Sequence, residues 1–232
     1  MKGSLHNSSQ SFICRCCKAD SPITDGLNTD LHLDIGNGVL LEKVDKFCYL
    51  GDMLDADGGC DSAVTTRVRS AWRKFSEYLP ILTGKGFSLK LKGKVYATCM
   101  RSCLMHGSET WPMKVEHELK MNHTKMSMIR WMCGVKLKRK NSEELRELLG
   151  LEPVSLMIKK SRLRWFGHVK RKDDDDWVKR CTTWEVEGIR QKGRPKQTWW
   201  DCVKNDMENL GRSQRDAQSR NKWQRRTKGA TS

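Results

Sequence analysis

Hydrophobic side chains recur every three or four residues in three consecutive segments of the chain. This spacing places them on one face of a helix and so predicts three amphipathic helices. The first helix follows the turn at 55–62, where Asp61 or Ser62 is expected to cap it, and it ends at the sequence TGKG. The second helix spans Ser88–His106 and the third spans Val115–Cys133.

Each predicted helix carries its own buried row. The rows are Val64, Val68, Ala71, Trp72, Phe75, Leu79 and Leu82 in the first helix, Leu91, Val95, Cys99 and Cys103 beside Tyr96 and Met100 in the second, and Val115, Leu119, Met126, Ile129 and Cys133 in the third. Because an isolated amphipathic helix cannot bury its apolar face, the three helices should pack together as a bundle.

Short runs typical of β-strands precede these helices. The runs LHLDI at 31–35 and VLLEKV at 39–44 are joined by Gly-Asn-Gly, and both residue types accept the positive φ of a tight hairpin. The next run, FCYLGDML at 47–54, is expected to form a further strand. A short β-hairpin should therefore lie before the bundle.

Basic linkers and helical patterns alternate in the second half of the chain. The sequence KLKRKN at 136–141 is expected to link two lobes, after which Ser142 caps a short helix that ends at Gly150. A longer basic helix begins at Pro153, a Trp-rich helix follows, and Trp223 should dock near the end. The predicted fold is mainly α, with a leader at 1–30, a hairpin plus helical bundle at 31–135 and a basic helical domain at 136–232.

The charge of the chain favours a polyanionic partner. The 232 residues include 44 Lys and Arg against 28 Asp and Glu, a net charge of +16, which is typical of proteins that bind nucleic acid or anionic surfaces. Most of the excess lies from Lys136 onward. The sequence contains neither an apolar run long enough for a membrane span nor a signal-peptide pattern, so we expect an intracellular protein with no membrane partner.

One cysteine pair has the spacing of zinc ligands. Cys14 and Cys17 form a C-x-x-C pair, but His6 is the nearest further ligand and a tetrahedral site needs four. The favoured interpretation is a non-functional remnant or a disordered leader, with a working zinc site as the alternative. The cysteines within helical patterns, such as Cys99 and Cys103, are expected to be reduced thiols.

Three sequence blocks resemble the tail of a non-LTR retrotransposon reverse transcriptase of the LINE or RTE type. They are KFCYLGDML at 46–54, RLRWFGHVKRK at 162–172 and KGRPKQTWWDCVKNDM at 192–207, within a resemblance that runs over about 31–228. The resemblance implies the end of the palm, the thumb and the C-terminal linker region. It assigns a primer-grip role to Phe47, Tyr49, Leu50 and Gly51, and it makes Cys14 and Cys17 the last ligand pair of a PHD-like or RING-like zinc module.

The catalytic centre of such a polymerase is not found in this sequence. Polymerases bind two Mg²⁺ ions with carboxylates, and reverse transcriptases supply a pair from an aromatic-x-Asp-Asp turn between apolar strands. The adjacent aspartates Asp173–Asp176 follow a basic helix without flanking strands, which is typical of a solvated loop. His168 has no nucleophile and acid beside it in the pattern, so we interpret it as structural. We predict no catalytic residue and an inactive chain when it is alone.

The expected function is therefore binding of RNA, an RNA-DNA template-primer or DNA through basic helical faces. The candidate phosphate-contacting residues are Arg67, Arg69, Arg73, Lys74, Lys90, Lys92, Lys94, Arg162, Arg164, Lys170, Arg171, Lys192, Arg194 and Lys196. An alternative is a retroelement-derived DNA-binding regulator, which would use a helix-turn-helix-like lobe after residue 142 and a Gly-Arg-Pro arm like that of an AT-hook. A zinc-binding interaction module is the third hypothesis.

Overall fold

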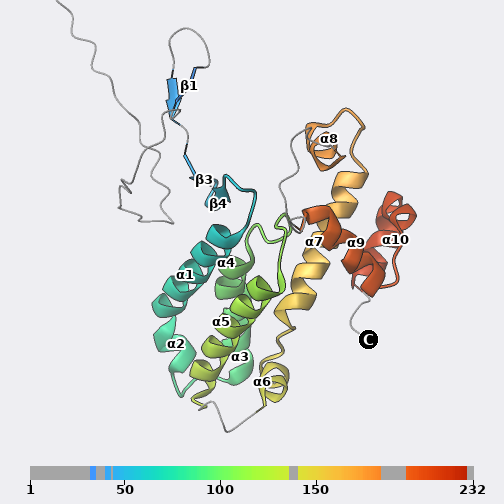
Figure 1. Ribbon diagram of the computed structural model, residues 1–232. Helices are drawn as coiled ribbons and strands as arrows, with labels where there is room; N and C mark the ends of the chain where they lie inside the picture. The colour runs from blue at the N-terminus through green and yellow to red at the C-terminus, as the bar shows by residue number, and fades with distance from the viewer. Residues whose placement is uncertain (1–31, 35–39, 43, 136–140, 184–196, 229–232) are drawn as a thin grey trace, which may run out of the picture.

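The computed structural model describes residues 32–34, 40–42, 44–135, 141–183 and 197–228 (Figure 1). Within these residues the chain is mainly helical, and short antiparallel hairpins precede the helices, which confirms the predicted fold class. Strands β1 (His32–Asp34) and β2 (Leu40–Glu42) pair with each other, as do β3 (Lys46–Tyr49) and β4 (Asp52–Asp55). No helix among the described residues combines the length and the apolarity needed to cross a bilayer.

The segment 47–54 is a hairpin, so the prediction of a single strand there was wrong. Tyr49 pairs with Asp52, which leaves Leu50 and Gly51 as a two-residue turn with φ of 48° and 81°. Positive φ at both central residues is the mark of a type I′ turn, whose twist matches that of the flanking strands. Gly51 accepts this conformation without strain, and the chain therefore reverses at Leu50 although leucine disfavours it.

The first helical pattern forms two helices, α1 (Asp61–Glu77) and α2 (Leu79–Thr83), and not one as predicted. The break falls at Tyr78 because Pro80 has no N–H to continue the helical ladder. The predicted cap was also wrong, since Cys60 occupies the N-cap position and makes no side-chain cap bond. The carboxylate of Asp55 in β4 accepts the orphan N–H of Ser62 instead, at 3.1 Å.

The second helical pattern runs through α3 (Leu89–Val95), a π-helical segment η1 (Tyr96–Met100) and α4 (Arg101–Met105). Its buried row is Tyr96, Met100 and Leu104, whereas Leu91 is 42 % exposed. The π-helical turn inserts one residue and rotates the faces that follow. The row assigned from a regular 3.6-residue period was therefore only partly right.

The third helix, α5, spans Val115–Cys133 as predicted, and Gly134 ends it in the left-handed conformation. Its buried face was predicted only in part. Met126 and Ile129 are buried, but Val115 and Leu119 are 75 % and 53 % exposed, whereas His117 and Met121 of the same turns are buried.

The C-terminal half contains α6 (Ser142–Leu149), α7 (Val154–Lys170), α8 (Trp177–Thr183), α9 (Trp199–Asn209), the short 3₁₀-helix η2 (Gln214–Gln218) and α10 (Arg220–Lys228). Gly150 ends α6 with φ of 63°, as its sequence position predicted. Trp223 is buried as expected, and its indole N–H donates to the carbonyl of Leu163 at 2.8 Å. Gly167 permits this contact, since a Cβ there would lie 2.3 Å from the indole nitrogen.

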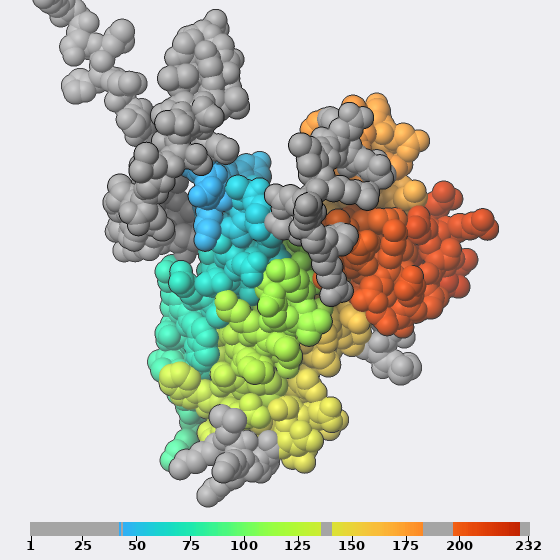
Figure 2. Space-filling model, viewed as in Figure 1, coloured from blue at the N-terminus to red at the C-terminus, as the bar shows by residue number. Residues whose placement is uncertain are grey.

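Two hydrophobic clusters meet within α7. The first contains the bundle α1–α5 together with Leu145 and Leu149 of α6 and Val154 and Ile158 of α7. The second joins the rest of α7 to α9 and α10, and its buried members are Leu163, Phe166, Val203, Met207, Ala217 and Trp223. Figure 2 shows the helices of the first cluster on one side of the molecule and α9 and α10 on the other. The predicted domain boundary at residue 136 stays a prediction.

Candidate nucleic-acid interface

Five of the predicted phosphate-contacting residues have exposed side chains. Arg69 and Arg73 lie one turn apart on α1, Lys90 and Lys94 lie one turn apart on α3, and Arg164 lies on α7. Among the described residues, Arg69, Lys90 and Lys94 have neither a hydrogen bond nor an ion pair through their side chains. These three cations are therefore available to an external anion without first breaking an internal contact.

Two predicted contact residues on the same helices are buried, so their placement on an exposed face was wrong. Arg67 is 6 % exposed, and its guanidinium donates to the carbonyl of Gly51 and lies 3.9 Å from the carboxylate of Asp52. Lys92 is 5 % exposed and donates to the carbonyl of Met132 at 3.4 Å. A long basic side chain can fold inward along apolar neighbours when a polar partner lies at its end. Here those partners come from other elements of the fold.

Arg162 of α7 is a third predicted contact residue whose placement on an exposed face was wrong. It is buried and its Nη1 lies 2.8 Å from Oδ2 of Asp206 in α9. Burial raises the pKa of the Asp206 carboxyl, and the Arg162 guanidinium opposes that rise. This ion pair joins α7 to α9 within the protein, and neither group faces solvent.

The remaining described candidates are half-buried or already bonded. Lys74 lies 2.6 Å from the carboxylate of Glu77, and Arg171 donates from Nη1 to the carbonyl of Ala217 at 2.8 Å. Lys170, at the end of α7, is half-buried. The predicted residues Lys192, Arg194 and Lys196 of the Gly-Arg-Pro segment, and the predicted zinc ligands Cys14 and Cys17, lie outside the described residues.

The residues given a primer-grip role form an exposed apolar edge. Phe47, Tyr49 and Leu50 are 54 %, 57 % and 82 % exposed, and the Phe47 and Tyr49 rings stack with centroids 6.5 Å apart. Gly51 lies at the turn, and its carbonyl accepts a hydrogen bond from the Arg67 guanidinium. The hairpin β3–β4 is thus fixed to the bundle on one face and leaves its aromatic face uncovered within the described residues.

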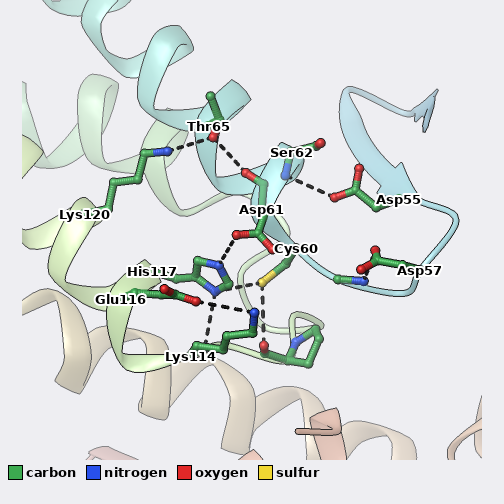
Figure 3. Close-up of polar contacts among 12 residues, drawn as sticks. Asp55, Asp57, Cys60, Asp61, Ser62, Thr65, Lys114, Glu116, His117 and Lys120 are labelled. Carbon is green, nitrogen blue, oxygen red and sulfur yellow. Dashed lines mark hydrogen bonds and ion pairs between the residues drawn. The ribbon is translucent and has the colours of Figure 1, made fainter. Parts of the chain in front are cut away.

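A polar cluster joins the first turns of α1 and α5 (Figure 3). His117 lies 2.9 Å from the Asp61 carboxylate through Nε2, and its Nδ1 accepts the backbone N–H of Lys114 at 3.2 Å. Since Nδ1 accepts, the ring proton sits on Nε2 and is donated to Asp61. The hydrogen bond from His117 lowers the pKa of the Asp61 carboxyl.

This cluster contains a thiol beside the same imidazole, with Cys60 Sγ 3.3 Å from His117 Nδ1. The arrangement has the outline of a nucleophile, a base and an orienting acid. However, Cys60 is only 2 % exposed, and burial raises its pKa to about 12. A buried protonated thiol is not a nucleophile. The cluster therefore has a structural role, in which it connects the first turns of α1 and α5.

Asp61, Glu116 and His117 could also offer three metal ligands, whose candidate atoms lie within 4.8 Å of one another. The two carboxylates are exposed, and Glu116 lies 3.4 Å from the ammonium of Lys114. Zinc usually takes four ligands and calcium six or more oxygens. Three donors that already have internal partners do not amount to a built metal centre.

The acidic run after α7 lies in an exposed turn, as predicted. Asp174 lies 2.6 Å from Lys179 and Asp176 lies 2.7 Å from Lys172, and these hydrogen bonds lower the pKa of both carboxyls. Paired with lysines in this way, the aspartates do not converge on a common point as metal-binding carboxylates do.

His168, interpreted as structural from the sequence, is exposed and lines an open pocket between α7 and α10. The pocket also contains Arg164 and Arg171 from the predicted set. Its other lining residues carried no predicted role and are Glu109, Ser161, Trp165, Lys172, Arg220 and Gln224. The α7 members recur at three- and four-residue spacing and could have been recognised as one face. Arg220 and Gln224 reach the pocket only through the tertiary fold.

The packing of α7 bears on the helix-turn-helix alternative. This helix contacts α5 on one side and α9, α10 and η2 on others (Figure 1). A recognition helix must leave one face free along its length to enter a DNA groove. One face of α7 stays open at Arg164 and His168, so the packing does not test the regulator hypothesis, which stays a prediction.

The chain is similar to an uncharacterized transposon-derived protein of Caenorhabditis elegans. The two are 25 % identical over 176 residues, which is 72 % of this chain and 62 % of the relative. The chain thus spans less than two thirds of that protein. No protein-family model and no solved structure matches the chain. The similarity indicates a transposon origin.

Proposed function

We propose that this chain is the thumb-like and C-terminal segment of a retroelement reverse transcriptase and that it binds the backbone of an RNA-DNA template-primer without polymerising. The observation that carries the proposal is the set of cations Arg69, Lys90 and Lys94 on α1 and α3, which have no partner among the described residues. Such cations on a rigid helical bundle can neutralise phosphates and release counterions. The similarity to a transposon-derived protein supports the same class.

The proposed contacts are to the backbone and carry little sequence selectivity. Arg69 and Arg73 project from one helix and Lys90 and Lys94 from another, and phosphate contacts fix the position of a protein on a duplex but do not specify bases. An A-form hybrid is recognised largely by its shape, its phosphates and its 2′-hydroxyls. The exposed aromatic edge at Phe47 and Tyr49 would then lie toward the rest of the polymerase and the primer end.

The test is fluorescence-anisotropy binding of the full chain to three labelled ligands at several salt concentrations. The ligands are an RNA-DNA hybrid, duplex DNA of unrelated sequences and single-stranded RNA. We expect the hybrid to bind most tightly, with affinity that falls steeply as salt rises. Preference for one DNA sequence would favour the regulator hypothesis, and absence of binding at low salt would overturn the proposal.

A further inference from the structure

An open pocket of about 540 Å³ lies between α7, α10 and the loop that contains Glu109. From α7 come Ser161, Arg164, Trp165 and His168, which share one face of the helix, and from α10 come Arg220 and Gln224, which lie one turn apart. Its volume falls in the range of pockets that enclose small ligands. None of the residues with a buried structural role on α7, such as Arg162 and Leu163, belongs to it.

The charge of this pocket is positive and incompletely balanced. Four basic residues line it, and Glu109 is the one carboxylate among its lining residues. Lys172 is neutralised by Asp176 at 2.7 Å, but Arg164 bonds only to the hydroxyl of Ser161, at 3.2 Å, among the described residues. Burial and the neighbouring Arg220 together lower the pKa of Arg171. Guanidinium groups held close together are stabilised by an anion placed between them, and phosphate suits them in geometry.

The same pocket also offers aromatic surface. The rings of Trp165 and His168 lie 5.5 Å apart with a tilt of 33°. Trp165 is half-buried and His168 is exposed. Nucleic-acid-binding proteins combine such rings with basic residues because every base has a π-face that can stack. Ser161, Gln224 and Glu109 add polar groups that can meet hydroxyl or amino groups of a nucleotide.

We propose that the pocket between α7 and α10 binds one unpaired nucleotide of a nucleic-acid strand, with its base against Trp165 and His168 and its phosphate between Arg171 and Arg220. The proposal rests on the proposed function, since it adds a site for a single-stranded end to a protein that holds a duplex. It assigns to α7 and α10 a role that differs from the backbone contacts of α1 and α3.

The test compares a blunt RNA-DNA hybrid with the same hybrid carrying a one-nucleotide 5′-phosphorylated overhang, both titrated into the full chain. We expect the overhang to tighten binding by about tenfold, within the range that stacking of one base supplies. The variants Arg220→Gln and His168→Ala, both at exposed positions, should abolish that gain and leave blunt-hybrid affinity unchanged. Arg225→Gln on the same helix is the matched control, because Arg225 is exposed but does not line the pocket.

The outcomes separate this proposal from the function on which it rests. If the blunt hybrid binds and the overhang adds nothing, the pocket proposal is overturned while backbone binding stands. If neither binds, both are overturned. Competition by adenosine monophosphate (AMP) and by inorganic phosphate identifies the chemistry that the pocket recognises. If AMP removes the tighter binding of the overhang and inorganic phosphate does not, the pocket recognises a nucleotide. Equal competition by inorganic phosphate would show simple anion binding and would overturn the stacking role.

Discussion

The guanidinium of Arg162 lies 2.8 Å from the carboxylate of Asp206, and the two side chains are 3 % and 2 % exposed. The pair connects α7 to α9 inside the second hydrophobic cluster. Nε and Nη2 of Arg162 have no hydrogen-bond partner among the described residues. The cost of removing both charges from water is therefore only partly offset by their mutual attraction.

We predict that Asp206→Asn destabilises the chain by roughly 3 kcal/mol, because it leaves the Arg162 cation buried without its counter-charge. The double variant Arg162→Met with Asp206→Leu should recover most of that stability, since apolar side chains of similar size avoid the desolvation cost. Urea unfolding followed by circular dichroism measures both changes. Arg164→Met, at an exposed position on the same helix, is the control, and equal destabilisation in the single and double variants would contradict the prediction.

Leu50 offers a stabilising substitution. It adopts φ of 48° in the β3–β4 turn and is 82 % exposed, so it is strained and buries little apolar surface. Leu50→Asn creates the Asn-Gly sequence that type I′ turns favour and should raise the free energy of unfolding by about 1 kcal/mol. Thermal unfolding tests the change against Leu54→Asn, which lies in the neighbouring strand and should not stabilise. A lower melting temperature for Leu50→Asn would show that Leu50 makes a contact of its own.

Lys125 should make stability depend on pH. Its side chain is buried and donates to the carbonyl of Glu152, and burial lowers its pKa to about 8 from 10.5. Between these values the unfolded chain holds a proton that the folded chain has released, so the free energy of unfolding rises with pH across this window. Below pH 8 the full penalty of burying the charge applies.

The variant Lys125→Met removes this penalty. At pH 7 it should be more stable than the parent chain by up to about 3 kcal/mol, less the contribution of the hydrogen bond to Glu152. That advantage should shrink toward pH 10.5. Urea unfolding at several pH values gives the difference between the two proteins, in which the titration of other groups cancels. The exposed Lys120→Met is the control, and a pH-independent difference for Lys125→Met would rule out the assigned cause.

The salt dependence of nucleic-acid binding tests the interface on α1 and α3. The triple variant Arg69→Gln, Lys90→Gln and Lys94→Gln should reduce the slope of log affinity against log salt by roughly 2 to 3 on duplex DNA, about 0.9 for each phosphate that is no longer neutralised. A matched triple variant replaces lysines that already have carboxylate partners. It comprises Lys114→Gln, Lys160→Gln and Lys179→Gln, whose partners are Glu116, Glu152 and Asp174. Similar slopes for the two triple variants would argue against a specific interface.

Local signals predicted the helices well where nothing interrupted them. The range Val115–Cys133 and the left-handed Gly150 follow from hydrophobic period and glycine chemistry, which act over a few residues. Two errors also had local causes that the sequence contained. Pro80 divides the first helix, and Leu50-Gly51 turns a predicted strand into a hairpin. In both places the apolar pattern predicted a continuous element, although the proline or glycine indicated a break.

The candidate site was harder to predict because exposure is decided by partners distant in the sequence. Arg67, Lys92 and Arg162 occupy helix positions that looked as available as that of Arg69. They are buried because Gly51, Met132 and Asp206 from other elements offer them oxygen acceptors. The spacing of hydrophobic residues along one helix does not predict such contacts with distant residues.

The sequence by itself determined a basic, mainly helical chain with a hairpin before its bundle, since propensity, period and charge are properties of neighbouring residues. Only the tertiary structure decided which cations face solvent, that α7 belongs to both hydrophobic clusters, and that Arg220 of α10 lines the same pocket as Arg171 and Trp165. The physical reason is that burial and pocket formation depend on contacts between segments far apart in the chain. Those contacts form only when the apolar faces of α7, α9 and α10 pack together.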